Sequence, residues 1–336
     1  MTTTITQSEI VIRTQPEKTQ YPAPLKLSGA LDQFKHVEVT PVIGREYPNV
    51  NVVDDILNAK NSDELLRDLA ITSRPLISLP PGFFLSLTPC LLLVSQRGVV
   101  FFRAQDNLTD DLQKTLVHRL GQLSGKPADS TLHIHPLLNS THEFGVEDNE
   151  ISTISSAGFK LFPRQVQKKD RDDRKGGAAS WHSDIQFEEY PADYTSLRLV
   201  ELPASGGDTL WASGYELYDR FSDPYRRFLE GLTATYTGEG FHKAAQADPE
   251  RFQIYEKPRG NPANIGGGLT AVHPVVRTNP VTGWKSLYAI GNFPQRINEL
   301  SAREGRDLLD LFKRRIEENH DLQVRFKWTN KNDLGK

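Results

Sequence analysis

Two side chains in one short segment of this sequence could bind a metal ion. His182 and Asp184 stand two residues apart in the run Trp181-His182-Ser183-Asp184. A neutral imidazole and a carboxylate both suit iron, and residues two apart on a strand point to the same side. The pattern therefore predicts two ligands of a facial iron site. Such a site needs a second histidine as its third protein ligand.

This motif is weak evidence when it stands alone. Nine histidines and 43 acidic residues in 336 positions predict about one His-x-acid match by chance. His36-Val37-Glu38 is a second match, which we interpret as that accident. By the motif alone, an ordinary hydrogen-bonded histidine is the simpler interpretation of His182. The neighbouring segments must decide between the two interpretations.

The composition indicates a globular protein and excludes several partners. Apolar residues make up 37% of the chain and charged residues 25%, as in soluble domains. A formal charge of −3 gives no basic surface for nucleic acid. The single cysteine, Cys90, fits a reducing compartment and predicts a cytoplasmic protein. Prolines interrupt the long uncharged run 76–94, so we expect no membrane span, and the sequence leaves homo-oligomer formation open.

Strands in the middle of the chain and helices near both ends would have to position these residues. Apolar patterns predict strands over 98–103, 132–138, 194–202, 286–290 and 323–328. They predict helices over 54–69, 106–123, 215–232 and 301–318, the second capped by Asp106 or Asn107 and the third broken near Pro224. A capping box of Ser301 and Glu304 is expected to begin the last helix. This order favours a mainly β domain, a sandwich or jelly roll with added helices, over residues 31–336 after a flexible arm over 1–30.

Four motifs in a fixed order give the pattern a specific context. They are His182-Ser183-Asp184 and the segments 197–203, 206–211 and 273–278, the last beginning His273-Pro274-Val275-Val276. Together they resemble the taurine dioxygenase family, Fe(II)- and 2-oxoglutarate-dependent enzymes that include 2,4-D dioxygenase and fungal sulfonate dioxygenases. The similarity runs from about Phe34 to Trp328 with gaps. It implies a double-stranded β-helix core and the use of Fe(II), 2-oxoglutarate and O2.

The resemblance also implies roles for single residues. His182 and Asp184 would bind iron, and the hydroxyl of Thr209 would bond a carboxylate of 2-oxoglutarate. His135 would contact the substrate anion as a partly buried imidazolium, with an ordinary structural histidine as the alternative. Phe293 would line the pocket, and core packing is its alternative. The implied substrate is a small organic anion, for which we expect a sulfonate. Ala178 replaces an asparagine of the taurine enzyme, which argues against taurine itself.

Two departures from the family pattern suggest a rival interpretation. In relatives, a strand like 323–328 is soon followed by the second iron histidine and by an arginine that binds 2-oxoglutarate, whereas here the sequence reads on from Thr329 to Lys336 without either. A segment rich in Pro, Leu and Phe at about 72–94 is also atypical, and we hypothesise that it is translated non-coding sequence. The alternative is therefore a catalytically inactive, truncated homologue whose jelly roll is incomplete at its C-terminus.

Overall fold

The computed structural model of the protein describes residues 24–71, 97–137, 148–155, 181–329 and 333–335. Its helices are α1 (Ser62–Ile71), α3 (Asp110–Leu123), α6 (Gly214–Asp219), α7 (Asp223–Glu230), α8 (Glu239–Ala247) and α9 (Ala302–Glu318). Its strands are β1 (Val37–Glu38), β2 (Arg45–Tyr47), β3 (Val100–Phe102), β4 (Leu197–Arg198), β5 (Thr209–Ala212), β6 (Thr233–Thr237), β7 (Thr270–Pro274), β8 (Val276–Thr278), β9 (Lys285–Leu287), β10 (Pro294–Ile297), β11 (Gln323–Phe326) and β12 (Leu334–Gly335).

The strands form one larger sheet and three smaller ones. The larger sheet has the order β1-β2-β3-β12-β4, in which β2 and β3 are parallel and the other pairs antiparallel. The smaller sheets have the orders β10-β6-β7, β11-β5 and β8-β9. Strand β12 therefore joins two strands from much earlier in the chain. Helices and strands are mixed, so the expectation of a mainly β architecture is confirmed only in part.

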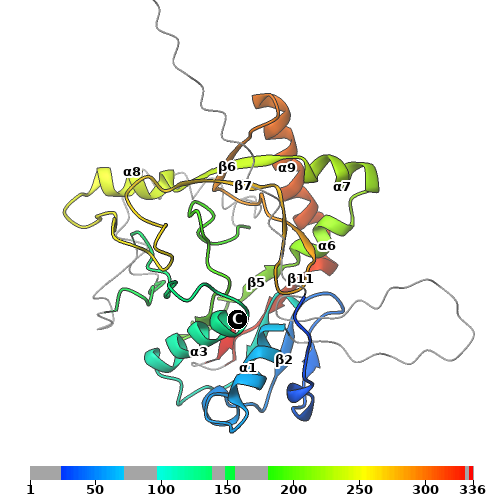
Figure 1. Ribbon diagram of the computed structural model, residues 1–336, viewed down its shortest axis with the longest axis vertical. Coiled ribbons are helices and arrows are strands. Elements are labelled where there is room, and N and C mark those ends of the chain that lie inside the picture. The colour runs from blue at the N-terminus through cyan, green and yellow to red at the C-terminus, as the bar shows by residue number, and fades with distance from the viewer. Residues whose placement is uncertain (1–23, 72–96, 138–147, 156–180, 330–332, 336) are drawn as a thin grey trace, which may run out of the picture.

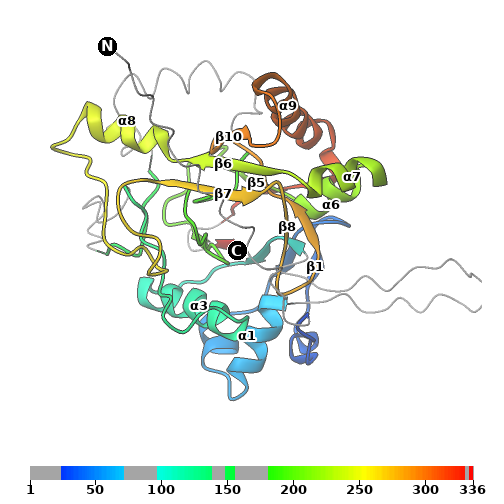
Figure 2. The same ribbon diagram turned by 45° about the horizontal axis from the view of Figure 1, so that its top comes forward.

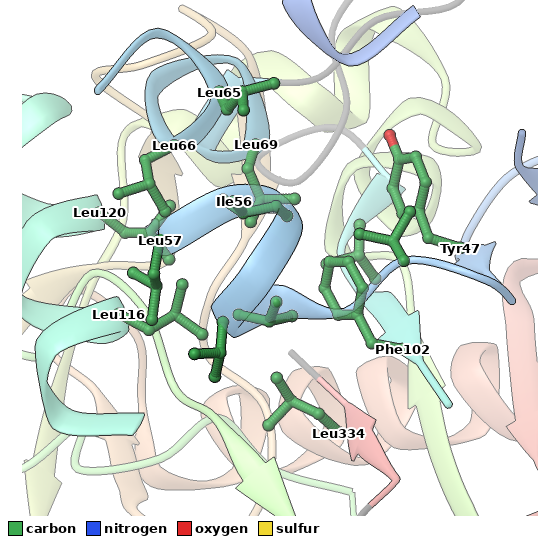
Figure 3. Close-up of a cluster of buried hydrophobic side chains, with 14 of the residues drawn as sticks. Tyr47, Ile56, Leu57, Leu65, Leu66, Leu69, Phe102, Leu116, Leu120 and Leu334 are labelled. Carbon is green, nitrogen blue, oxygen red and sulfur yellow. The ribbon is translucent and has the colours of Figure 1, made fainter. Parts of the chain in front are cut away.

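Two buried clusters form most of the core, at opposite ends of the molecule. Helices α1 and α3 pack together at one end, whereas α6, α7 and α9 lie at the other (Figures 1 and 2). Figure 3 shows the first cluster, in which leucines of both helices meet Tyr47, Phe102 and Leu334 of the larger sheet. The second cluster packs Phe312 of α9 against Leu229 of α7 and residues of β6. None of the described helices combines the length and apolar character needed to cross a membrane.

Local signals place some of the helix ends. The helix expected over 54–69 is instead divided into η2 (Val52–Leu57) and α1. The expected capping box is present, with Ser301 Oγ bonded to the backbone N–H of Glu304 at the start of α9. The expected break near Pro224 separates α6 from α7. The expected cap of α3 at Asp106 or Asn107 is wrong, because Thr109 Oγ1 accepts from Leu112 N. The side chain of Asn107 instead contacts the start of η2. It accepts a hydrogen bond from the amide of Asn51, the N-cap of η2, and donates one to the carboxylate of Asp54.

The strand expected over 132–138 is also wrong for its described part. Residues 131–137 form neither helix nor strand, and their backbone bonds instead to a distant loop. Thr131 N donates to Gly260 O, and Tyr255 N donates to Pro136 O. These bonds hold the segment that carries His135 against residues 255–260. The atypical segment at 72–94, Ala178 and most of the predicted N-terminal arm lie outside the described residues.

Asp333 attaches the last described segment to the sheet. Its carboxylate is fully buried and accepts hydrogen bonds from Arg103 Nη1 at 2.9 Å, Ala104 N at 3.0 Å and Thr329 N at 3.1 Å. A buried carboxylate needs such donors, because desolvation is costly when the charge is unpaired. These bonds attach Asp333, just before β12, to Thr329 and to the two residues that follow β3.

Candidate active site

Asp184 begins an irregular turn and His182 lies just before it, so neither is on a strand, as the spacing argument had assumed. Residues 184–187 form a turn closed by Glu188 N bonding to Ile185 O at 3.0 Å. Ile185 has a φ of 47°, which is rare for a β-branched residue. The two side chains meet nevertheless, because the turn brings them together where a strand would have done so by alternation.

The two side chains are placed as neighbouring ligands of one ion would be. His182 Nε2 and Asp184 Oδ1 are 3.2 Å apart, and the side chains are 48% and 56% exposed. Two ligands at right angles on an ion with bonds of about 2.1 Å stand about 3 Å apart. The hydrogen bond from His182 lowers the pKa of Asp184, against a smaller opposing effect of burial. Asp184 is therefore ionised at neutral pH, as a metal ligand must be.

The described residues supply only these two ligands. Within the described ranges, His, Cys, Asp and Glu side chains nowhere form a group of three that could hold a metal ion. His273 is buried, and its Nε2 donates to the carbonyl oxygen of Glu188 at 2.8 Å. This hydrogen bond gives His273 a structural role, because it attaches β7 to the residue that follows the turn over 184–187. The pair of His182 and Asp184 thus fits two positions of a facial site.

Gly291 supports the turn from behind. It has a φ of 97°, and a Cβ there would lie 2.6 Å from both His182 Cβ and Trp181 O. Real side chains do not approach so closely, so only glycine allows the chain after β9 to pass the segment that carries His182. Gln186 adds a second attachment, because its Nε2 donates to the carbonyl oxygen of Tyr288.

An aromatic cluster lies beside the two ligands. Phe293 faces His182 edge to face, with ring centroids 6.4 Å apart. Phe187 lies 5.2 Å from Phe293 and 5.4 Å from Phe241, so the three rings form one wall. The sequence singled out Phe293 but missed the other two. Phe187, three residues after Asp184, carried a weak signal, whereas nothing local distinguished Phe241.

His135 reaches the far side of this aromatic wall. Its ring packs edge to face on Phe241 at 4.9 Å, and it interacts electrostatically with Asp184. Burial, with a smaller contribution from nearby His133, lowers the pKa of His135 to about 4. The imidazolium expected from the sequence is therefore wrong, because the ring is neutral at pH 7. Leu137 N donates to Nδ1 at 3.1 Å, so Nε2 carries the proton and is the hydrogen-bond donor.

A buried ion pair joins the turn to the segment that carries His135. Arg259 and Glu188 are 2% and 3% exposed by side chain, and two bonds of 2.5 and 2.9 Å join them. His133 Nε2 lies 3.1 Å from the same carboxylate. Burial alone would raise the pKa of Glu188, but the bonds from His133 and Arg259 outweigh it and lower the pKa. Sequence analysis missed this pair, whose members stand 71 positions apart.

Thr209, at the start of β5, takes no part in the contacts described above. Its hydroxyl accepts a hydrogen bond from the indole of Trp328 at 2.9 Å. The structure thus gathers His182, Asp184, Phe293 and His135 around one aromatic wall, and it places Thr209 on the sheet formed by β5 and β11.

Comparisons with known proteins identify the family of this chain. A family model described as taurine catabolism dioxygenase TauD, TfdA family matches residues 90–334. The alpha-ketoglutarate-dependent dioxygenase oryG of Aspergillus oryzae is 43% identical over 321 residues, covering 94% of this chain and 84% of that protein. The alpha-ketoglutarate-dependent sulfonate dioxygenase of Saccharomyces cerevisiae is 32% identical over 296 residues, covering 88% of this chain and 58% of that protein.

A solved structure shares the fold. The crystal structure of a taurine dioxygenase from Burkholderia xenovorans matches with a TM-score of 0.54 and 21% identity, covering 90% of this chain and 78% of that chain. Identity at this level supports the fold alone. The family resemblance inferred from the four motifs is therefore confirmed by the sequence comparisons, and the structural match supports the fold.

Proposed function

Because this chain belongs to the taurine catabolism dioxygenase TauD, TfdA family, we propose that it hydroxylates a small organic anion with an iron ion held by His182 and Asp184. By family it is an alpha-ketoglutarate-dependent dioxygenase, and such enzymes use Fe(II), 2-oxoglutarate and O2. The observation that supports the site most directly is the 3.2 Å separation of His182 Nε2 and Asp184 Oδ1 beside an aromatic wall.

The protein's own residues would bind and orient the reactants. When bound, iron supplies the activation of O2. The rings of Phe187, Phe241 and Phe293 would exclude water from the reacting carbon. His135 would bind an anionic group by donating from neutral Nε2, which orients the substrate without adding charge. Thr209 would hydrogen-bond a carboxylate of 2-oxoglutarate.

A sulfonate is the proposed substrate class. The relative from Saccharomyces cerevisiae is named a sulfonate dioxygenase. Oxygen insertion into the C–H bond beside sulfur, coupled to oxidative decarboxylation of 2-oxoglutarate to succinate and CO2, would give a hydroxysulfonate. Its C–S electron pair would leave with sulfite while the hydroxyl loses a proton, and an aldehyde would remain. We further propose a single domain over 31–336 and a cytoplasmic location, in line with the lone Cys90.

Iron binding is the first test of this proposal. We expect anaerobic addition of Fe(II) and 2-oxoglutarate to give a saturable visible charge-transfer band, and His182→Ala to abolish it by removing one of the ligands. His36→Ala is the matched control, since His36 belongs to the other His-x-acid match and bonds through Nδ1 to Phe34 O. Folded wild-type protein that gives no band would contradict the proposal and favour the inactive homologue.

Substrate class is tested separately with alkyl sulfonates and carboxylates of equal chain length. We expect 2-oxoglutarate turnover to succinate, together with sulfite release, for sulfonates only. The neutral donor at His135 can serve either anion, but only a sulfonate carries a group that leaves as sulfite. Iron binding with equal turnover of both series would leave the metal site intact and overturn the sulfonate assignment.

A further inference from the structure

Trp328 and Thr209 are brought together by the pairing of two strands. Strand β11 runs antiparallel to β5 with Phe326 opposite Thr209, and the two strands lie side by side in Figure 1. Trp328 follows two residues after Phe326, where its indole Nε1 reaches Thr209 Oγ1 at 2.9 Å. The bond depends on strand register, so neither residue could have been linked to the other from its local sequence.

Packing on several sides fixes the direction of the indole N–H. Trp328 is only 3% exposed, and its ring packs at 5.0 Å from Phe326 and 6.3 Å from Trp211. At Gly335, a Cβ would lie 2.9 Å from Cη2 of this ring, so β12 closes over its edge without leaving space. A ring held in this way cannot turn its N–H away from Thr209.

The chemistry of the two groups then fixes the direction of the threonine hydroxyl. An indole N–H can only donate, so Thr209 Oγ1 must be the acceptor in this bond. One lone pair of the oxygen is used, and its single proton must point elsewhere. Among the described residues, no acceptor takes that proton. A hydroxyl that accepts one hydrogen bond also becomes a better donor in the next, because the bonds polarise each other.

We propose that Trp328 is a positioning residue that aims the Thr209 hydroxyl proton at a carboxylate of 2-oxoglutarate. The inference rests on the proposed role of Thr209 and adds a second residue that acts through it. Trp328 does not touch the cosubstrate. Its indole holds the threonine oxygen from behind, so that the donor is already oriented before 2-oxoglutarate arrives.

The test is Trp328→Phe, which keeps an aromatic ring but removes the N–H. We expect calorimetric binding of 2-oxoglutarate in the presence of Mn(II) to weaken about fivefold or more, as for loss of one hydrogen bond. Mn(II) affinity measured without 2-oxoglutarate should not change. Trp284→Phe is the control, since Trp284 packs on Tyr215 and does not contact Thr209. In ¹⁵N-labelled protein, the indole N–H resonance that Trp328→Phe removes should shift when 2-oxoglutarate binds to wild type.

A double-mutant cycle separates positioning from general loss of packing. In a Thr209→Val background, Trp328→Phe should cause no further loss of 2-oxoglutarate affinity, because the acceptor is already gone. An equal loss in both backgrounds, or unchanged affinity in Trp328→Phe alone, would overturn the inference and leave the proposed function standing. Folded wild-type protein that binds Mn(II) but not 2-oxoglutarate would instead overturn the role of Thr209, and this inference with it.

Discussion

Replacing Gly291 by alanine is expected to weaken Fe(II) binding about tenfold to a hundredfold, the usual cost of disturbing the residues behind a metal ligand. The new Cβ would lie 2.6 Å from His182 Cβ and from the carbonyl oxygen of Trp181. Both neighbours belong to the segment that leads into the turn, and its backbone cannot move aside as a flexible side chain can. Because φ at Gly291 is 97°, alanine would also be strained there whatever space it found. The turn must therefore shift, and His182 with it.

The matched control is Gly268→Ala. An added Cβ there meets nothing within 4 Å, and the backbone does not need the left-handed region. We expect unchanged Fe(II) affinity in this variant, measured by anaerobic titration, and near-native thermal unfolding. Gly291→Ala should remain folded, since the clash is confined to one turn. If folded Gly291→Ala bound Fe(II) with wild-type affinity, iron binding would not depend on the position of His182, and the proposed ligand role would be contradicted.

Replacing Arg259 by methionine is expected to lower the free energy of unfolding by about 3–5 kcal/mol, the cost of leaving one member of a buried ion pair without its partner. Glu188 is 3% exposed and would lose both of its guanidinium bonds. The same substitution removes the donors to Tyr255 O and Gly266 O, so the loop after β6 and α8 would loosen as well. Urea unfolding followed by circular dichroism measures the change.

An exposed arginine in a similar pair provides the control. Arg251 contacts Asp248 at 3.2 Å, with side chains 52% and 31% exposed. Because water screens such a pair, Arg251→Met should cost less than about 1 kcal/mol. The double variant Glu188→Met, Arg259→Met should recover part of the lost stability, since no unpaired charge stays buried. Equal losses in Arg259→Met and Arg251→Met would refute the view that burial makes the first pair important.

The site depends on this ion pair for geometry as well as stability. Glu188 stands four residues after Asp184. Its carboxylate also contacts the imidazole of His133, which stands two residues before His135. One buried carboxylate therefore sets the spacing between the turn that begins at Asp184 and the segment that carries His135. Loss of stability and loss of substrate orientation should accompany each other in variants of Glu188, whereas Gly291→Ala should affect the metal alone.

The local sequence determined the features that depend on neighbouring residues, such as helix caps and helix breaks. The capping box of Ser301 and Glu304 was predictable because its bonds span three residues, and Pro224 had to interrupt a helix because it lacks an N–H. Four ordered motifs were enough to identify the family and with it the candidate ligands. His182 and Asp184 were found although the strand proposed for them is a turn, because a spacing of two residues brings them together in either conformation.

Tertiary structure decided whatever depends on partners distant in the sequence. Asn107 does not cap α3, because Asn51 and Asp54 engage its amide. His135 is neutral because the fold buries it, and a side chain's pKa follows its surroundings more than its own chemistry. Phe241 reaches the site through side-chain packing. Arg259 reaches it through an ion pair with a residue 71 positions away, and Trp328 lies beside Thr209 because of strand register. The sequence by itself thus determined the family and two candidate ligands, and only folding decided which protons, charges and rings surround them.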